Sequence, residues 1–543
     1  MTFEMVKTSP ITGQKPGTSG LRKKTRVFMA PHYLENFIQA IFNSIGGAKG
    51  KSFVVGGDGR FFNRQAIQTI LKIAAANGAA RIIVGWNGLL STPAASHLIR
   101  INGTDGGIIL SASHNPGGID EDFGVKFNVP NGGPAPESVT SAMLAETLTL
   151  SSYRIARLPD TDLDVLGETE LGGMQVSVVD PVEDYLALMR TLFDFDAIRT
   201  MFAGGFSMCF DAMHAVTGPY AKKILEDVLG APKGTVINSV PLEDFGGGHP
   251  DPNPIWASTL IDLMMSDNAP DFGAASDGDG DRNMIVGRGQ YVTPSDSLAV
   301  LVANAQLAPG YAAGIAGVAR SMPTSAASDK VAEKLGIECF ETPTGWKFFG
   351  NLMDAGRVTI CGEESAGTGS DHVREKDGLW AVLLWLNILA VRKQPVARLL
   401  ADHWAEYGRN YYSRHDYEAV PTDAANDLMG NVIGQLATLR GKTFAGQTVS
   451  RADEFCYRDP IDGSVSDHQG LRIWFEGGGR AVLRLSGTGT EGATIRVYLE
   501  QYQPDMSAIS QPAQQVLLPL QQAVADLVRM QHFLGRTKPD VVT

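Results

Sequence analysis

The chain carries three carboxylates that alternate with glycines, in the sequence DGDGDR at residues 277–282. Oxygen ligands at every second residue, on a backbone that glycines allow to wrap, suit a hard divalent cation. At ~4 Å and an effective dielectric of about 20, each carboxylate pair would cost on the order of 4 kcal/mol without a counter-charge. The pattern predicts that Asp277, Asp279 and Asp281 bind magnesium, which usually takes few protein ligands and completes its shell with phosphate oxygens.

Two other interpretations of this acidic run were weighed. An EF-hand loop needs glycine at its sixth position and glutamate at its twelfth, where this chain has Arg282 and Arg288, so the EF-hand is excluded. A solvated acidic turn stays open as the plain alternative. Such a turn seldom follows a buried strand, and the apolar run FGAAS at residues 272–276 has that character.

A nucleophile is predicted at Ser113, in the sequence SASHNPGG at residues 111–118. The apolar run at residues 107–110 precedes it directly and reads as a strand. Ligands of open α/β sheets bind outside the carboxyl ends of the strands, so we expect this hydroxyl to be offered to a substrate and not packed away. An ordinary polar turn is the alternative. A phosphate on Ser113 would complete the magnesium shell.

A third polar loop, CGEES at residues 361–365, follows the strand-like run at residues 358–360. We expect Glu363 and Ser365 to face outward together and to bind the hydroxyl groups of a polyhydroxylated ligand. A helix N-terminal cap would use the same residue types and remains the alternative.

The fourth polar loop is RLSGTGTEGATIR at residues 484–496. Its glycines and small hydroxyl residues let backbone N–H groups converge on an anion, and Arg484 and Arg496 supply charged donors. The loop lacks the Gly-Lys-Ser/Thr of a Walker A motif, and a flexible hairpin is the alternative. Phosphoryl transfer needs positioning and charge neutralisation, which the four loops together could supply.

The segments that must position these loops have α/β character. Between Phe53 and Leu110 a strand FVVGG, a helix over residues 63–77 and a strand RIIVG follow one another, and Asn63 and Gly78 are expected to cap the two ends of the helix. The pattern returns after Val179, with a helix over residues 220–229, and again from about Leu301. The runs LRIWF and AVLRL near the C-terminus predict an antiparallel sheet backed by helices.

We therefore predict an α/β protein with three successive α/β domains of similar size and a C-terminal α+β domain. The expected limits are residues 1–178, 179–300, 301–395 and 396–543. A length of 543 residues agrees with several domains.

Composition narrows the partners. A formal charge of -13 and a pI near 5.3 argue against a nucleic-acid or anionic-membrane surface. The most apolar stretch, Leu379 to Val391, is shorter than the ~18 residues of a membrane span, so we expect a buried helix there. Four widely spaced cysteines and an N-terminus without an apolar signal core predict reduced thiols and a cytoplasmic protein.

The combination resembles the α-D-phosphohexomutase superfamily and, within it, the phosphoglucomutases of the eukaryotic type. The resemblance runs nearly end to end. It implies four domains around a central cleft, of which the first three are related and share one mixed-sheet α/β topology. The motifs that carry it are KPGTSGLR (15–22), SASHNPGG (111–118), DGDGDRNM (277–284), ETPTGWKFFGNLMDAG (341–356), CGEESAGTGSDHVREKDGLWA (361–381) and RLSGTGTEGATIR (484–496).

The resemblance also implies roles for individual residues. Ser113 would be the phosphoserine and would hold Mg²⁺ together with Asp277, Asp279 and Asp281. The residues implied at the reacting end are Arg22, His114, Lys126 and Lys376; we favour Lys126 and His114 for proton transfer and the other two as charge stabilisers. The residues implied in binding the substrate are Thr18, Ser19, Arg282, Thr344, Gly345, Glu363, Ser365, Arg484, Ser486, Thr488 and Arg496.

The implied reaction converts glucose 1-phosphate and glucose 6-phosphate into one another, with glucose 1,6-bisphosphate as intermediate and activator. Partners would be small sugar phosphates, with neither nucleic acid nor membrane, and the protein would be a monomer or a weak homodimer. Two alternatives stay open: a sister mutase acting on mannose or N-acetylglucosamine phosphates, and a non-catalytic, mutase-like scaffold protein. Ser113 and all three aspartates are present, which favours the enzyme.

The resemblance implies a preference for glucose, because CGEES within its longer block is similar to the glucose-specific branch of the superfamily. We expect faster turnover of glucose 1-phosphate than of mannose 1-phosphate. Initial rates on both substrates at equal concentration measure this preference. Equal rates would contradict it.

Overall fold

The computed structural model describes residues 3–17, 19–486, 492–505, 507 and 509–543. Its residues form two compact units. The first comprises Met1–Pro294, Asn304–Ala316 and Gly345–Ala397, and the second comprises Ser295–Ala303, Gly317–Thr344 and Arg398–Thr543.

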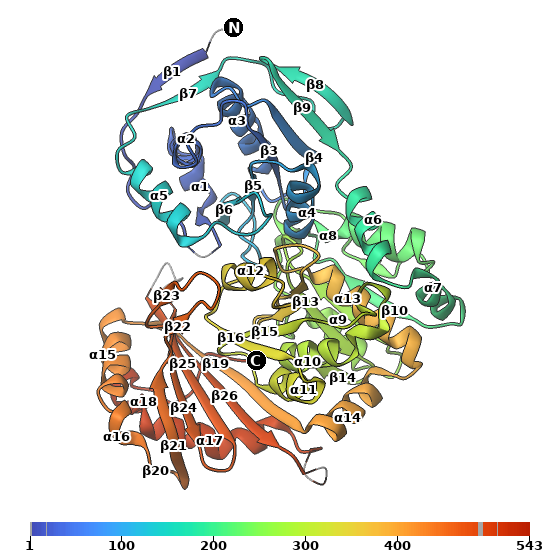
Figure 1. Cartoon of the computed structure of the whole chain (residues 1–543), viewed down its shortest axis with the longest axis vertical. Helices are drawn as coiled ribbons and strands as arrows, with labels where there is room; N and C mark the ends of the chain where they lie inside the picture. Colours follow the sequence, from blue (N-terminus) through green and yellow to red (C-terminus); the bar gives the residue numbers. More distant parts are fainter. Residues whose placement is uncertain (1–2, 18, 487–491, 506, 508) are drawn as a thin grey trace. The chain divides into compact units, whose positions relative to one another are not determined.

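The N-terminal part of the first unit is built on a mixed seven-stranded sheet (Figure 1). Its central strands β5, β3, β4 and β9 run parallel, and the flanking strands are antiparallel to their neighbours. In spatial order the strands are β2 (Leu21–Lys24), β6 (Asp122–Asn128), β5 (Gly107–Leu110), β3 (Ser52–Gly57), β4 (Arg81–Leu89), β9 (Met174–Val179) and β8 (Gly167–Leu171). The helices of this part are α1 (Thr25–Phe28), α2 (Tyr33–Ser44), α3 (Asn63–Ala76), α4 (Thr92–Asn102) and α5 (Glu137–Thr147), and β1 (Phe3–Lys7) pairs with β7 (Ser152–Ala156).

A second mixed sheet in the same unit has five strands, with β10 parallel to β11 and β12 and the rest antiparallel. In spatial order they are β11 (Val236–Ile237), β10 (Met208–Asp211), β12 (Phe272–Ser276), β13 (Asn283–Gly287) and β14 (Gln290–Val292). The helical segments are α6 (Glu183–Leu192), α7 (Phe195–Ala203), α8 (Thr217–Ala221), η1 (Lys222–Val228), η2 (Phe245–Gly247) and α9 (Ser258–Met264). The remainder of the unit holds η3 (Ala305–Leu307), η4 (Pro309–Tyr311), α12 (Lys347–Asp354), α13 (Gly378–Arg392) and the antiparallel pair β17 (Ile360–Gly362) and β18 (Thr368–Ser370).

The three polar loops of this unit occupy the same place in the topology. Each one connects a strand to the next strand of the chain, which returns antiparallel beside it. These connections are β5 to β6, β12 to β13 and β17 to β18. The predicted chemistry of the three loops therefore rests on one repeated structural device.

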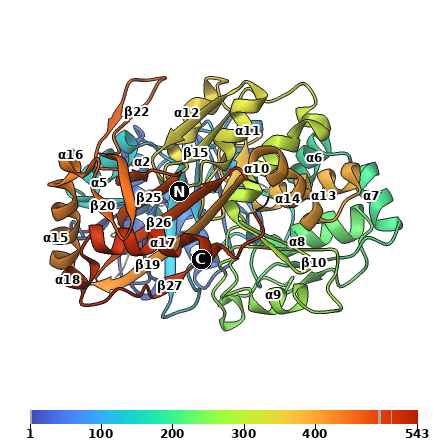
Figure 2. The same cartoon turned by 90° about the horizontal axis from the view of Figure 1, so that it is seen from below.

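The second unit contains an antiparallel seven-stranded sheet backed by helices, as predicted for the C-terminal region. Alternate residues Leu471, Ile473 and Phe475 of β24 are buried, as the LRIWF pattern requires. In Figures 1 and 2 helix α17 lies along this sheet, where it packs on β19 and β26. The strands in spatial order are β20 (Thr443–Phe444), β21 (Gln447–Glu454), β24 (Leu471–Phe475), β25 (Gly479–Ser486), β26 (Ala493–Gln503), β19 (Arg409–Val420) and β27 (Val541–Val542).

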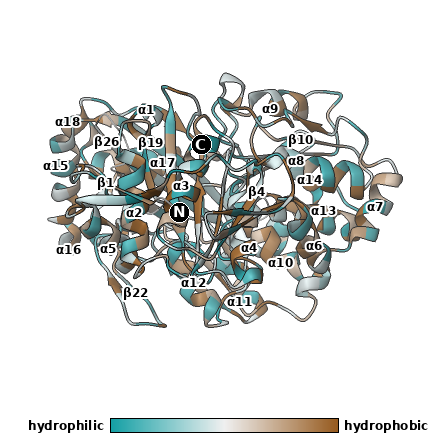
Figure 3. Ribbon diagram, turned by 90° about the horizontal axis from the view of Figure 1, so that it is seen from above, coloured by the Kyte–Doolittle hydropathy of each residue, from teal (hydrophilic) through white to brown (hydrophobic). Residues whose placement is uncertain are grey.

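The other elements of this unit surround that sheet or precede it in sequence. Strand β15 (Gly317–Ser321) pairs in parallel with β16 (Glu338–Thr342), and β22 (Tyr457–Arg458) forms a ribbon with β23 (Val465–Ser466). Figure 3 shows hydrophilic and hydrophobic residues within the same helices. In α15 the buried residues Ala425, Leu428 and Val432 recur at helical spacing, which is typical of one buried face. The helices are α10 (Pro294–Asn304), α11 (Ala327–Leu335), α14 (Val396–Tyr407), α15 (Thr422–Ile433), α16 (Leu436–Leu439), α17 (Ala513–Leu527) and α18 (Met530–Leu534).

Two local predictions were wrong. Asn63 does not cap α3: Phe62 occupies the N-cap position, and the Asn63 amide donates to the carbonyl oxygen of Gly88. The Asn63 side chain therefore bonds a residue distant in sequence and not the N–H groups at the start of its own helix. The helix expected at residues 220–229 begins at Thr217 and continues as the π-helical turn η1. Gly78 does end α3, with a left-handed φ of 78°.

The apolar stretch near residue 385 is a buried helix, as predicted. Helix α13 is buried along every residue from Gly378 to Ala390. Asp377 caps it by accepting a hydrogen bond from the Trp380 amide. No helix within the described residues combines the length and the apolar character needed to cross a lipid bilayer. Helix α13 therefore belongs to the interior of the first unit.

Replacing Leu384, which is fully buried in α13, tests how much the packing of this helix contributes to the stability of the protein. We expect Leu384→Ala to destabilise the protein by about 2–5 kcal/mol, because it leaves a cavity among packed side chains. Val391 in the same helix is 43% exposed, so Val391→Ala is the matched control. Denaturant unfolding measures both. Equal unfolding midpoints for the two variants would contradict the assignment of α13 to the core.

Candidate active site

The loop after β5 holds Ser113 in a strained, tightly bonded turn. The φ of Ser113 is 54°, a left-handed conformation that costs a serine free energy and persists only where surrounding contacts impose it. Its N–H donates to Ser111 Oγ at 2.7 Å, and its carbonyl accepts from Arg60 at 2.8 Å. Ser113 is only 2% exposed, so the prediction that the serine is not packed away was wrong. The aspartate loop packs against it.

A buried ion pair stabilises the turn that contains Ser113. Arg60 and Asp58 form a salt bridge at 2.9 Å with both side chains fully buried. Asp58 also accepts from Ser111 Oγ at 2.6 Å. Burial raises the pKa of Asp58, and Arg60 opposes that change. Because Arg60 bonds both Asp58 and the Ser113 carbonyl, this pair fixes the backbone of the serine turn.

Asp277 joins the aspartate loop to the serine. Its Oδ2 accepts a hydrogen bond from Ser113 Oγ at 2.8 Å, and its Oδ1 accepts from the Arg282 N–H at 3.0 Å. A Cβ on Gly278 would lie 2.3 Å from the carbonyl oxygen of Ser113, so only glycine permits this approach. Burial, reinforced by Asp281 and Asp279, raises the pKa of Asp277 well above its ordinary value.

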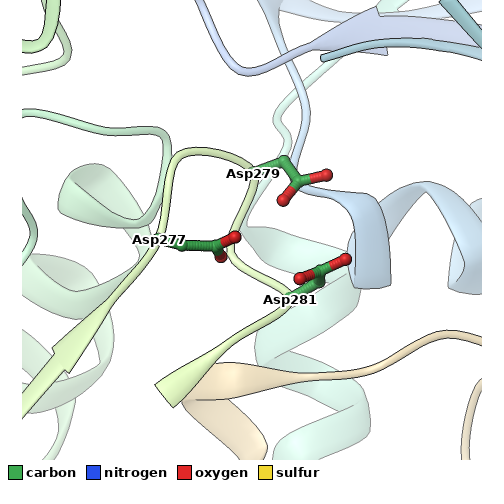
Figure 4. A group of neighbouring side chains, drawn as sticks. All are labelled: Asp277, Asp279 and Asp281. Carbon is green, nitrogen blue, oxygen red and sulfur yellow. The ribbon is translucent and has the colours of Figure 1, made fainter. Parts of the chain in front are cut away.

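The three aspartates form a buried cluster in which one carboxylate oxygen from each residue lies within 4.8 Å of the other two. All three come from the single loop after β12 (Figure 4). Asp279 Oδ1 and Asp281 Oδ1 are buried and have no hydrogen-bond partner among the described residues, which is costly for a carboxylate. Oxygen atoms of this kind, clustered and without donors, fit a hard divalent cation.

Two lysines contact the other oxygens of the cluster. Lys126 Nζ lies 2.8 Å from Asp279 Oδ2 and 2.8 Å from Thr92 Oγ1, and Lys376 Nζ lies 3.0 Å from Asp281 Oδ2. Burial would lower the pKa of Lys126, but Asp279 and other nearby carboxylates outweigh it and raise that pKa. Burial would likewise raise the pKa of Asp279, yet Lys126 and Thr92 hold it below its ordinary value. This pair is therefore ionised.

His114 stands beside the serine among positive charges. Its Nδ1 lies 3.4 Å from Ser113 Oγ. Burial lowers its pKa well below the ordinary value, and Arg282 and Arg22 lower it further. Burial also lowers the pKa of Arg22, which is opposed by Asp279. These effects favour the neutral form of the imidazole.

The third loop, between β17 and β18, turns its glutamate inward. Glu363 is 6% exposed and accepts from the Gly345 N–H at 2.9 Å, so the expected outward orientation was wrong for Glu363. Ser365 is partly exposed. No helix begins at this loop, which excludes the helix-cap alternative. A Cβ on Gly367 would lie 2.3 Å from Lys376 Cδ, so this glycine lets the Lys376 side chain pass.

The remaining predicted residues lie apart from that cluster in the chain. In the second unit, Arg484 on β25 stands directly opposite Arg496 on β26, and Arg496 lies 3.6 Å from Asp416. Ser486 ends β25 and is partly buried, as is Thr344, whose buried Oγ1 has no hydrogen-bond partner. In the first unit, Ser19 is exposed in a turn, whereas Thr18 and Thr488 lie outside the described residues.

Several residues that build the site were not predicted. They share buried or partly buried positions around the serine and aspartate loops, and they are Asp58, Arg60, Thr92, His249, Asp251 and Glu375. Burial raises the pKa of Glu375 to about 7. His249 stacks on Trp256 with ring centroids 4.5 Å apart and lies 6.3 Å from the His114 ring. For His249 and Asp251, the available signal was the run HPDPNPIW at residues 249–256, which is rich in polar residues between prolines.

Comparison with known proteins now places the chain. Family models for α/β/α domains I, II and III of phosphoglucomutase/phosphomannomutase match residues 13–154, 183–290 and 294–407. A model of the C-terminal domain of phosphoglucomutase-1 matches residues 409–540. The chain belongs to the phosphoglucomutase/phosphomannomutase family. Its four-domain architecture and the predicted resemblance are thereby confirmed.

Individual relatives cover the whole chain. A phosphoglucomutase of Rhizobium radiobacter is 60% identical over 100% of both chains, and a cytoplasmic phosphoglucomutase of Pisum sativum is 51% identical over 100% of this chain and 99% of its own. The crystal structure of parafusin, a phosphoglucomutase from Paramecium in its open form, has a TM-score of 0.93 at 48% identity and covers 100% of this chain and 99% of its own. A phosphomannomutase structure from Thermus thermophilus, at 23% identity and a TM-score of 0.70, shares the fold.

The orphaned carboxylate oxygens predict cation binding that depends on Asp281. We expect Asp281→Asn to weaken Mg²⁺ binding at least about tenfold, because a charged ligand becomes neutral. Titration calorimetry on chelator-treated protein measures the affinity. Asp271→Asn, which changes a partly exposed aspartate paired with Arg288, is the control and should leave the affinity unchanged. Unchanged binding in Asp281→Asn would exclude this cluster as the cation site.

Proposed function

We propose that the chain interconverts glucose 1-phosphate and glucose 6-phosphate, with Ser113 as the phosphoryl carrier. The observation that carries this proposal is the 2.8 Å contact between Ser113 Oγ and Asp277, inside a cluster of three aspartates. Full-length relatives at 51–60% identity carry the name phosphoglucomutase, which supports the same reaction. The alternatives have weaker support. The phosphomannomutase structure is only 23% identical to this chain. A non-catalytic scaffold protein could lose its nucleophile or its aspartates, whereas this chain retains Ser113 and all three aspartates.

We propose Mg²⁺ as the cation of the aspartate cluster. Asp277, Asp279 and Asp281 would hold it, together with an oxygen of phosphorylated Ser113. When bound, the ion would neutralise charge on the transferring phosphoryl group. The cluster fits this ion because it offers only oxygen ligands, two of which have no other partner.

In the proposed first half-reaction, phosphorylated Ser113 transfers its phosphoryl group to the free hydroxyl of the bound sugar phosphate. The bond between phosphorus and Ser113 Oγ breaks and a bond between phosphorus and the sugar oxygen forms. The sugar hydroxyl gives its proton to a protein base, and the released Ser113 oxygen takes up a proton, so that the serine hydroxyl is regenerated. The product is glucose 1,6-bisphosphate. After this intermediate reorients, its other phosphate returns to Ser113 and the second hexose phosphate leaves.

The electrostatics of the site support separate roles in proton transfer and in charge stabilisation. His114 is neutral and 3.4 Å from Ser113 Oγ, so we propose proton transfer at the serine oxygen for His114. Lys126 is held as a cation by Asp279, so we now propose charge stabilisation for Lys126 in place of proton transfer. Arg22 and Lys376 would stabilise charge as well.

The remaining residues would bind the substrate. Glu363, Ser365, Thr344 and Gly345 are proposed to bind sugar hydroxyls. A second set is proposed for the phosphates, with the last four binding the group that is not being transferred: Thr18, Ser19, Arg282, Arg484, Ser486, Thr488 and Arg496. The direct pairing of Arg484 with Arg496 supports this role, because two cations on one face of a sheet favour an anion.

We further propose sugar phosphates as the partners, a monomer or weak homodimer, and a cytoplasmic location. Relatives include proteins named cytoplasmic and proteins named chloroplastic, so the location rests on the sequence composition as well. We also propose domain limits at residues 1–178, 179–300, 301–395 and 396–543.

Ser113→Ala tests the proposed function. We expect turnover to be abolished while thermal stability changes little, because the variant removes the phosphoryl acceptor and one hydroxyl hydrogen bond. A coupled glucose 6-phosphate assay measures turnover, and mass analysis of the peptide containing residue 113 measures phosphorylation. Ser266→Ala, at an exposed serine whose hydroxyl bonds only its own helix end, is the control. Substantial turnover by Ser113→Ala would mean that the nucleophile lies elsewhere.

A further inference from the structure

The segment at residues 371–377 carries Lys376 into the aspartate cluster and is anchored at both ends. On one side, the Arg374 N–H donates to Ser96 Oγ at 3.0 Å, and its guanidinium bonds Asp354 at 2.6 Å. On the other side, Asp377 accepts from the Tyr185 hydroxyl at 2.7 Å. Glu375 and Lys376 lie between these anchors. Neither anchor reaches the strand that carries Lys126.

Glu375 supplies the missing contact. Its Oε1 accepts a hydrogen bond from Asn128 Nδ2 at 2.9 Å, and Glu375 and Asn128 are 2% and 0% exposed. Asn128 belongs to β6, two residues after Lys126, so the two side chains lie on the same face of that strand. The Asn128 amide also donates to Gly132 at 2.9 Å, which fixes its orientation.

This bond links the two lysines through their own backbones. Lys126 contacts Asp279 and Lys376 contacts Asp281, so the lysines hold two of the three carboxylates. Glu375 is the direct sequence neighbour of Lys376 and bonds the strand of Lys126. The segment runs close to β18, because a Cβ on Gly369 would lie 3.1 Å from the Glu375 carbonyl oxygen. A shift at Glu375 would therefore move Lys376 relative to Lys126.

We propose that Glu375 is a positioning residue, whose hydrogen bond to Asn128 sets the placement of Lys376 and Lys126 around the aspartate cluster. Glu375 acts through these lysines, because they and not Glu375 contact the aspartates. The inference rests on the proposed function, since it assigns the lysines to a phosphoryl-transfer site. Glutamine at this position retains an oxygen that can accept the same Asn128 hydrogen, whereas alanine does not.

Four variants test the inference in the full-length enzyme. We expect Glu375→Ala and Asn128→Ala each to lower kcat by at least about tenfold, the size typical of residues that orient those touching the reacting groups. KM for glucose 1-phosphate should stay within about threefold, because neither residue is proposed to bind substrate. Glu375→Gln should keep kcat within about threefold of the wild type, since it preserves the hydrogen bond. The double alanine variant should be no slower than the slower single variant, because both remove one shared interaction.

Glu226 provides the matched control. It is also buried, at 6% exposure, and its Oε1 accepts from the Gly234 and Val236 amides away from the aspartate cluster. Glu226→Gln and Glu226→Ala report what loss of a buried glutamate does to thermal stability and activity in general, and both should leave kcat unchanged. A kcat for Glu375→Gln as low as that of Glu375→Ala would overturn the inference, as would additive losses in the double variant. Absence of mutase turnover in the wild-type enzyme would overturn the proposed function. An active wild-type enzyme with either of these variant results would overturn only the inference about Glu375, so the two failures are distinguishable.

Discussion

Mutual repulsion among three buried carboxylates is the constraint on which the site depends. Asp277, Asp279 and Asp281 lie within 4.8 Å of one another in a part of the protein with little access to water. Repulsion and burial together favour protonation, and the pKa of Asp277 responds in that direction. The site offsets this with fixed cations and a serine hydroxyl, and the two oxygens that remain without donors mark where a further positive charge belongs.

The fold meets this constraint by bringing its polar loops to equivalent places. The serine, the aspartates and the inward glutamate each follow a strand whose successor returns antiparallel beside it. Glycines at the approach points remove side chains that would hold the loops apart, most directly at Gly278 against the Ser113 carbonyl. Buried ion pairs such as Arg60 with Asp58 then hold the serine turn in a conformation that serine alone would disfavour.

Much of the site was accessible from the sequence because its residues sit in short, contiguous patterns. The aspartate loop and Ser113 could be predicted from alternating carboxylates and from an apolar run before a polar turn. Asn63 was misassigned because its best partner, the Gly88 carbonyl, is 25 residues away in the chain. Glu375 went unnoticed for a similar reason, since its hydrogen bond reaches Asn128 across 247 residues.

The sequence by itself determined most element types and the four-domain architecture, and it predicted the candidate reactive groups, since periodicity and local motifs encode them. The ionisation and orientation of those groups were decided by tertiary structure. Ser113 is buried against Asp277, Glu363 turns inward to the Gly345 amide, and Lys126 is held as a cation by Asp279. The physical reason is that desolvation and hydrogen bonding act between residues distant in sequence, so their effect exists only once the chain is packed.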